Sequence, residues 1–429
     1  MTNKKQSIET LSLHAGYTPD KETRSIGVPL HRTDAYVFKD SKQAADLFAL
    51  KELGNIYSRL TNPTQEILEK RIASIEGAPA SLALASGTSA IFYSIINICQ
   101  AGDEIVSANN LYGGTYTMFD CILTQFGIKT HFVDAKKPSN FEQKINSKTR
   151  ALYIETIGNP GLDFTDIEAV SIIAKKHHLP LIVDATFTTP YLLNVIDHGA
   201  DIVCHSLTKW LGGHGTGIGG IVVDSGKFDW TDPKFELFNK PDKSYHGLRY
   251  AHDLGDLNNI AFALRMRLVP LRNLGACISP DNAWLFLQGI ETLALRMERI
   301  SQNALSIAKH LESHPKVAWV KYPGLNSHPT HNIAKKYLKK GFGGMVVFGV
   351  KGNIDAGKKF IENLKIISHL SSVGNTKSIA THPASTTHSQ LTEEQQKSGG
   401  ITPELVRLSI GIEHIDDLIT DIEDSLAKT

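Results

Sequence analysis

Short apolar runs separated by amphipathic stretches fill the chain between residues 64 and 224. Residues 64–75 place Ile67, Leu68, Ile72 and Ile75 on one face of a helix, and 166–178 is a second helical stretch. The apolar runs are shorter and are bounded by glycine and polar residues, so they predict buried strands. Strands that alternate with helices predict an α/β fold with a mostly parallel sheet. The predicted strands are 81–86, 104–108, 130–133, 151–155, 179–184, 201–203 and 220–224.

The two ends of the chain have different patterns. Prolines and glycines interrupt the first 60 residues, in which Ser41 is the expected N-cap of a helix that ends at residue 50. Residues 279–310 read as one long amphipathic helical region. Apolar strands at 345–350 and 407–412 then predict a smaller α/β domain. The expected parts are an N-terminal arm (1–60), a large domain (61–260) and a C-terminal domain (261–429).

The composition is that of an ordinary globular protein. The 429 residues are 41% hydrophobic and 21% charged, with a net charge of +1. This balance argues against nucleic acid or an anionic membrane as the main partner and leaves small-molecule chemistry. The four cysteines form no Cys-x-x-Cys pair, the N-terminus has no apolar core, and no apolar run reaches membrane-spanning length. These features predict a cytoplasmic protein. The polar run 392–400 predicts a solvated surface turn.

A lysine turn follows the predicted strand 201–203. Ser206 and Thr208 place two hydroxyls within three residues of Lys209, and six glycines follow from Gly212 to Gly220. A lysine that is partly desolvated and lies near another cation can lose its proton and act as a nucleophile or Schiff-base partner. Taken alone, Lys209 is better explained as a solvated surface lysine at a strand end, since most lysines are exposed.

Asp184 changes that interpretation. It ends the apolar run 179–184, and a carboxylate at the carboxyl end of a buried parallel strand points into the crevice where such sheets bind ligands. An aspartate there can hold a pyridinium nitrogen protonated, as pyridoxal phosphate (PLP) requires, although it can also cap a turn. Asp184 and Lys209 together predict a two-part site for one cofactor.

Three further positions are candidates for binding a phosphate or a flat ring. Tyr57 and Arg59 share one face of an extended segment, where they can bind a phosphate together or form an ordinary surface pair. A strand that leads through Gly87 and Thr88 into a helix offers backbone amides to an anion, or is a plain strand–helix turn. Tyr112 stands at a strand end beside two glycines, where its ring can stack on a ligand or pack on the core.

Two polar residues lie at other strand ends. Asn159 can contact a cofactor, but a turn-forming Asn-Pro pair explains it too. Arg407 is expected to begin the strand 407–412, where its planar fork suits an α-carboxylate, with a surface salt bridge as the alternative. The histidines of 328–331 and 177–178 lack carboxylate or cysteine partners nearby in sequence, so no metal site is predicted.

Two motifs carry a family resemblance, His205-Ser-Leu-Thr-Lys-Trp-Leu-Gly-Gly-His214 and His382-Pro-Ala-Ser-Thr-Thr-His388. The chain resembles the Cys/Met-metabolism family of PLP enzymes nearly end to end, from residues 10–16 to 406–413, and within it the O-acetylhomoserine sulfhydrylase branch. The resemblance implies a fold type I transferase with PLP as cofactor, a large, mostly parallel sheet domain and a smaller C-terminal α/β domain.

The resemblance also implies roles for the candidate residues. Lys209 would bind the cofactor covalently and then act as the general base, with Tyr112 stacked on the ring and sharing the proton transfers. Arg407, helped by Ser372, would bind the substrate carboxylate. Tyr57 and Arg59 would reach the cofactor phosphate of a neighbouring subunit, so that dimers, and a homotetramer built from them, share active sites. The other implied cofactor contacts are Gly87, Thr88, Asn159, Asp184, Ser206 and Thr208.

The expected reaction is a γ-replacement on an amino acid. The acetoxy group of O-acetyl-L-homoserine is replaced by sulfide or a thiol, giving homocysteine or methionine. The sulfur donor is sulfide, methanethiol or a carrier-protein thiocarboxylate. Cystathionine γ-synthase and methionine or cystathionine γ-lyase are the alternatives, and a non-catalytic cofactor-binding protein is a remote one.

Several positions depart from the family pattern. Ala185 stands where the family usually has asparagine, and His31-Arg32-Thr-Asp-Ala-Tyr36 replaces a Gln-Thr-Thr-Ser-Tyr segment. Ser372 stands where sulfhydrylases often have asparagine, and Gly114 stands where methionine γ-lyases typically carry cysteine. Gly114 therefore argues against a lyase, and the other departures leave the leaving group and the sulfur donor open.

Overall fold

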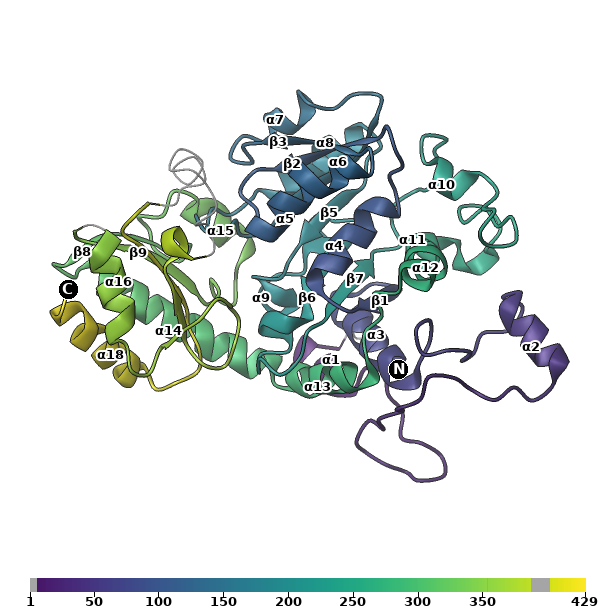
Figure 1. Ribbon diagram of the computed structural model, residues 1–429, viewed down its shortest axis with the longest axis horizontal. Helices are drawn as coiled ribbons and strands as arrows, with labels where there is room; N and C mark the ends of the chain where they lie inside the picture. The colour runs from purple at the N-terminus through teal and green to yellow at the C-terminus, as the bar shows by residue number, and fades with distance from the viewer. Residues whose placement is uncertain (1–5, 353, 387–401) are drawn as a thin grey trace.

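The computed structural model describes residues 6–352, 354–386 and 402–429, so the polar run at 392–400 lies outside the described residues. Two β-sheets lie side by side, and a long N-terminal arm projects from the body of the molecule on the side of the larger sheet (Figure 1). The buried hydrophobic side chains form two clusters, the smaller of which packs around the C-terminal sheet. The predicted α/β architecture, with a large sheet and a smaller C-terminal one, is confirmed.

Seven strands form the large sheet within the described residues, in the order β1-β7-β6-β5-β4-β2-β3. β7 is antiparallel to its neighbours β1 and β6, and all other neighbours are parallel. The inner strands β5, β6 and β7 are buried on both faces and read as continuous apolar runs, whereas the edge strand β3 is partly exposed. The strands are β1 (Ala80–Leu84), β2 (Glu104–Ala108), β3 (Lys129–Val133), β4 (Thr149–Glu155), β5 (Leu181–Asp184), β6 (Ile202–Ser206) and β7 (Gly220–Asp224).

Helix caps explain where the main helices of this part begin and end. The Asn62 side chain accepts the N–H of Thr64 at the start of α3, and Gly77 ends that helix in the left-handed region (φ 68°). Ser86 caps α4 by accepting the N–H of Ser89. The helices are α3 (Pro63–Glu76), α4 (Gly87–Ile96), α5 (Gly113–Thr117), α6 (Leu123–Gln125), α7 (Ser139–Glu142), α8 (Ile167–Lys176), α9 (Thr189–Leu192), α10 (Glu236–Asn239), α11 (Ala261–Met266) and α12 (Arg272–Leu274), with shorter helical turns between them.

The part of the chain that the structure describes also holds a five-stranded sheet, in the order β10-β11-β12-β9-β8. α14 packs against β8 and β9, and α16 and α18 pack together beside it (Figure 1). Its strands are β8 (Val317–Lys321), β9 (Met345–Val350), β10 (Ser368–His369), β11 (Ile379–Thr381) and β12 (Leu405–Ser409). The C-terminal helices are α13 (Pro280–Glu291), α14 (Leu293–Glu312), α15 (His331–Tyr337), α16 (Ile354–Asn363) and α18 (Ile415–Ala427).

Two local predictions were wrong, and a third holds only in outline. Arg407 is the middle residue of β12, because the buried Leu405 and Val406 already pair with β9. The long helical region at 279–310 is two helices, since the backbone leaves helical geometry at Thr292 (φ −106°, ψ 9°) between α13 and α14. The N-cap of α2 (Ser41–Phe48) is Asp40, whose carboxylate accepts the N–H of Gln43.

Within the N-terminal arm, residues 17–61 connect α1 (Ile8–His14) to α3. It is fixed to the body at Val28, whose carbonyl accepts the Trp284 indole N–H at 3.0 Å. Beyond that point it runs outward, carries α2 at its far end and returns (Figure 1). Along it, Val37 is 100% exposed and Leu53 is 70% exposed. The arm therefore presents apolar side chains that its own chain leaves uncovered.

In the described part of the chain, no helix is long and apolar enough to cross a membrane. All four cysteines are unpaired, and Cys99 and Cys204 are buried, as expected for small core residues. No group of three or more metal-ligating side chains gathers among the described residues.

Candidate active site

The lysine turn and Asp184 meet at the carboxyl edge of the large sheet. Asp184 ends β5 and pairs with Cys204 of β6, while Lys209 lies in the helical turn Leu207–Leu211 that follows β6. The side chain of Thr186 links the two segments. The N–H of Thr186 donates to Asp184 Oδ1 at 2.9 Å, and the N–H of Ser206 donates to Thr186 Oγ1 at 2.9 Å.

Asp184 is the one partly exposed residue of β5. Burial raises the pKa of its carboxyl, while a hydrogen bond from Thr186 and the nearby His205 ring oppose that rise. A cationic ligand group placed against Asp184 would favour its charged form. The predicted position at a strand end is confirmed.

Lys209 has the environment of a reactive amine. Its Nζ donates to Ser372 Oγ at 3.0 Å, and the backbone departs from helical geometry at this residue (φ −92°, ψ −138°). Burial lowers the pKa of the amine, and the nearby Arg407 guanidinium lowers it further. A neutral lysine amine is both a base and a nucleophile.

Arg407 is a second buried cation beside the first. Its side chain lies under the surface, and Nη1 donates to Asn159 Oδ1 at 3.1 Å. Burial lowers the pKa of Arg407 to about 10. Within residues 6–352, 354–386 and 402–429, no carboxylate pairs with this guanidinium. A buried fork without an anion is suited to a small carboxylate ligand.

Strand β12 also positions the loop that carries Ser372. Ser409 Oγ accepts the N–H of Gly374 at 2.8 Å. A Cβ at Gly374 would lie 2.7 Å from the Trp210 nitrogen, and φ is +83° there, so only glycine lets this loop lie against the lysine turn. One strand of the small sheet therefore supplies Arg407 and anchors the loop that contacts Lys209.

An anion cradle lies at the start of α4. The first amides of this ten-residue helix, those of Gly87 and Thr88, have no acceptor within the helix. A Cβ at Gly87 would lie 2.7 Å from Ser206 Cβ, so the missing side chain lets the helix start touch the lysine segment. Thr208 Oγ1 accepts the N–H of Gly219 at 3.1 Å and so ties the glycine loop to the same place.

Tyr112 directly precedes α5, makes no side-chain capping bond to it and has a half-exposed ring. Its N–H donates to Glu155 Oε1 at 2.7 Å. Its phenol lies near enough to Arg407 to oppose, by its charge, the fall that burial causes in the pKa of Arg407. A Cβ at Gly114 would lie 2.6 Å from Tyr112 Cε1, so the glycine leaves room for the ring. Asn159 is buried and faces Arg407.

Arg296 braces the lysine turn from α14. This buried guanidinium donates to the carbonyls of Trp210 at 2.7 Å, Leu211 at 3.1 Å and Gly289 at 2.7 Å. A Cβ at Gly213 would lie 2.1 Å from its Nη1, so glycine at 213 is what admits the guanidinium.

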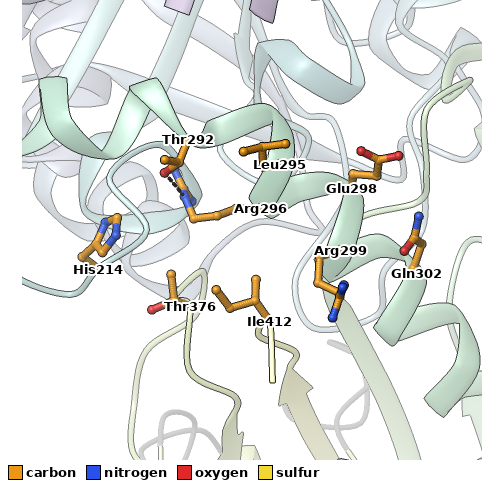
Figure 2. A pocket seen from close by; sticks show the side chains of 9 residues that line it. All are labelled: His214, Thr292, Leu295, Arg296, Glu298, Arg299, Gln302, Thr376 and Ile412. Carbon is orange, nitrogen blue, oxygen red and sulfur yellow. Dashed lines mark hydrogen bonds between the residues drawn. The ribbon is translucent and has the colours of Figure 1, made fainter. Parts of the chain in front are cut away.

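An open hollow of about 710 Å³ lies behind this brace. Figure 2 shows Arg296 on its wall, hydrogen-bonded to Thr292, with His214 and Thr376 from two neighbouring loops. Neither Lys209 nor Asp184 lines it. The hollow therefore belongs to the outer side of the lysine turn, away from the reactive amine.

Tyr57 and Arg59 lie on the arm, apart from the other candidates. The Arg59 guanidinium sits over the Tyr57 ring at 5.2 Å, and Tyr57 pairs with Ala35 of the same arm. No hydrogen bond or ion pair in the described part of the chain joins either residue to the lysine turn. The structure thus brings together every predicted site residue except these two.

Comparison with known proteins shows which family this chain belongs to. The model of the Cys/Met metabolism PLP-dependent enzymes matches residues 9–427. The chain belongs to that family. It is 53% identical to an O-acetyl-L-homoserine sulfhydrylase of Leptospira meyeri, over 97% of this chain and 96% of the relative. It is 49% identical to O-acetyl-L-homoserine sulfhydrylase 1 of Thermus thermophilus, over 98% and 100%.

A solved structure extends the comparison. The crystal structure of a putative O-acetylhomoserine (thiol)-lyase of Campylobacter jejuni, which contains N'-pyridoxyl-lysine-5'-monophosphate, matches with a TM-score of 0.95 and 42% identity. The match covers 98% of this chain and 100% of that one. The PLP cofactor and the fold expected from the sequence are thereby confirmed.

The site has the donor set that a Cys/Met-metabolism enzyme needs for PLP. The amine of Lys209 suits the aldehyde, and Asp184 suits the ring nitrogen. The cradle of Gly87 and Ser206, which a Cβ would fill, suits the phosphate. The described residues therefore fit the cofactor.

Four residues that shape the site were missed in the sequence. Glu155 had a signal, because it ends β4 as Asp184 ends β5. Thr186, Arg296 and the anchoring role of Ser409 had none, since the bonds by which they hold the lysine segment and its neighbouring loop span 20 to 86 residues of sequence.

Proposed function

We propose that the protein catalyses γ-replacement on O-acetyl-L-homoserine, exchanging the acetoxy group for sulfide or a thiol to give homocysteine or methionine. The observation that carries the proposal is the neighbouring pair Lys209 and Arg407, a buried amine and a buried guanidinium that pair with no carboxylate in the described part of the chain. A free amino acid supplies that carboxylate. Relatives with this printed activity, 43% to 53% identical over nearly the whole chain, support the choice of substrate.

The residues of this chain have distinct tasks in the reaction. Arg407 holds the substrate α-carboxylate with its fork, and its bond to Asn159 fixes the direction of that fork. Lys209 Nζ takes the proton from Cα and then one from Cβ, with the Tyr112 hydroxyl as a second proton carrier. Acetate leaves from Cγ, the sulfur adds there, and the protons return to Cβ and Cα in reverse order. PLP, when bound, stabilises the negative charge that develops on the substrate.

The cofactor is held from several sides in this proposal. Asp184 would hold the ring nitrogen, Tyr112 would stack on the ring and Asn159 would donate to its phenolic oxygen. Ser372, which accepts from Lys209 Nζ at 3.0 Å, holds the amine as well as assisting Arg407. The phosphate contacts are the amides of Gly87 and Thr88 and the hydroxyls of Ser206 and Thr208, which the cradle at α4 brings together.

Tyr57 and Arg59 complete the phosphate site of a second copy of the chain. The exposed apolar arm supports this assignment, since a surface of this kind normally meets a partner. The resulting dimers share active sites and pair into a homotetramer, with each chain divided into an arm (1–60), a PLP-binding part (61–260) and a C-terminal part (261–429). We place this biosynthetic enzyme in the cytoplasm.

Gly114 favours replacement over elimination. A side chain at 114 would push the Tyr112 ring out of its position, whereas the methionine γ-lyases of this family are expected to carry cysteine there. The ring position in this chain is therefore specific to a site with glycine.

A substrate panel with product mass tests the proposal. Purified protein receives O-acetyl-L-homoserine with sulfide, with methanethiol or with a thiocarboxylate carrier protein, then O-succinyl-L-homoserine with cysteine, then methionine alone. Homocysteine or methionine formed from the acetyl ester is expected. Cystathionine from the succinyl ester, or α-ketobutyrate from methionine, as the fastest product would replace the proposal with a synthase or a lyase.

A further inference from the structure

Glu155 is a buried carboxyl group that none of the tasks above uses. It is the last residue of β4, and its side chain is 6% exposed. On the neighbouring parallel strand it pairs in register with Asp184, so both side chains point to the same face of the sheet. Its Oε1 accepts the N–H of Tyr112 at 2.7 Å. One carboxyl group therefore lies between the ring-nitrogen aspartate and the stacking tyrosine.

The neighbours of Glu155 on this face are also titratable. Tyr153 lies two residues earlier on β4, and its side chain is fully buried. Cys204 faces the same space from β6, across Asp184. Burial raises the pKa of Glu155 well above its usual range, and the charge of Asp184 raises it further. Because Glu155 and Asp184 lie in register on neighbouring strands, a charge on one carboxyl group disfavours a charge on the other.

Tyr112 needs such an anchor. Its ring is 53% exposed and no side-chain contact caps the helix it starts, so its backbone is the part that the protein can hold. Glu155 reaches that backbone from the strand next to β5, across 43 residues of sequence. A neutral carboxyl group can accept this N–H without adding a second negative charge behind the cofactor ring.

We propose that Glu155 is a positioning residue that holds Tyr112 over the cofactor through its backbone amide, and that it does so as a neutral acceptor. The inference rests on the proposed site, but its test measures the affinity for PLP and not the turnover of substrate. A failure of the substrate assay would therefore leave it testable, and its own failure would leave the reaction standing.

A double-mutant cycle on the affinity for PLP separates positioning from general structural support. Apoprotein is titrated with PLP in the wild type, Glu155→Leu, Tyr112→Ala and the double variant. Glu155→Leu leaves the Tyr112 amide without its acceptor, so we expect about tenfold weaker binding in the wild-type background. In the Tyr112→Ala background the same change has less than about threefold effect, because the ring it serves is gone. An equal loss in both backgrounds overturns the proposal.

Glu155→Gln tests the neutral state and remains informative if the leucine variant does not fold. Glutamine keeps an acceptor oxygen at the same length and carries no charge, so it restores PLP affinity to within about threefold of wild type from pH 6 to pH 9. A tenfold loss in Glu155→Gln means that charge is required and overturns the proposal. Glu104→Leu is the matched control. Glu104 begins β2, at the amino ends of the strands and away from the site, where it bonds His131 and Asn146, so its loss leaves PLP affinity unchanged.

Discussion

The lysine turn and the N-terminal arm are built in opposite ways. The turn is braced on three sides, by Arg296 on its carbonyls, by the Gly374 loop and by the Thr186 bridge to Asp184. The arm touches the body at Val28 and at Phe48, whose carbonyl accepts the Tyr245 hydroxyl, and between these points it leaves apolar side chains in solvent. The lysine turn is packed by contacts within one chain, whereas the arm has apolar side chains that its own chain does not cover.

This difference divides the site into two halves with different requirements. The half around Lys209 needs exact amine, ring and carboxylate geometry, and dense packing within one chain supplies it. The half around Arg59 supplies charge to a phosphate, and in our proposal a second copy receives it. The predictions below test whether the two halves can be separated in this way.

The largest effect is expected at Lys209. Lys209→Ala removes the amine with the lowered pKa, so activity should fall by about 10²–10⁴-fold, the usual contribution of a positioned acid–base group, or by more. Borohydride reduction of the wild type followed by peptide mapping should label Lys209. Lys336→Ala, an exposed lysine in ion pairs with Asp166 and Glu168, is the control and should keep full activity. A label on any other lysine contradicts the assignment.

A smaller effect is expected at Arg407. Arg407→Lys keeps the charge and loses the planar fork, so kcat/KM for O-acetyl-L-homoserine should fall about tenfold or more, with little change in PLP affinity. Steady-state kinetics measures the first quantity and absorbance titration the second. If this variant kept the wild-type kcat/KM, another arginine would have to bind the substrate carboxylate. Arg32 and Arg249 are poor candidates, since they pair with Asp281 and Asp253 at the surface.

The smallest effect on activity, but a clear one on stability, is expected at Arg296. Arg296→Lys cannot donate to all three backbone carbonyls, and each buried acceptor left without a donor costs about 1–3 kcal/mol. Thermal unfolding of the apoprotein should show a lower Tm, whereas Arg299→Lys on the open side of the hollow should not. An unchanged Tm in Arg296→Lys would mean that the lysine turn is stable without the Arg296 hydrogen bonds.

The sequence predicts most of the fold because the strand signals are local. The runs that became β2, β7 and β9 were predicted at their observed bounds, since each is an apolar stretch between polar or glycine residues. Arg407 was misplaced at a strand start because a buried arginine in mid-strand depends on Asn159, which is 248 residues away. The helix break at Thr292 leaves no comparable local signal.

The candidate site divides in the same way. Lys209 and Asp184 follow from short motifs next to strands, which a sequence displays directly. The Arg296 brace and the Glu155 anchor depend on donors and acceptors that only the folded chain brings together. Residues that carry chemistry are visible in the sequence, whereas residues that position them are visible mainly in the structure.

The most direct test of the two-half account mixes two inactive proteins. Arg59→Ala and Lys209→Ala subunits are each expected to be inactive alone, because one lacks the phosphate contact and the other the amine. After random reassociation, half of the sites in mixed dimers combine an intact Lys209 with an intact Arg59 from the other chain. We therefore expect recovery of about a quarter of wild-type homocysteine formation from an equimolar mixture. No recovery, with mixed oligomers demonstrated by mass, would contradict the sharing of sites between chains.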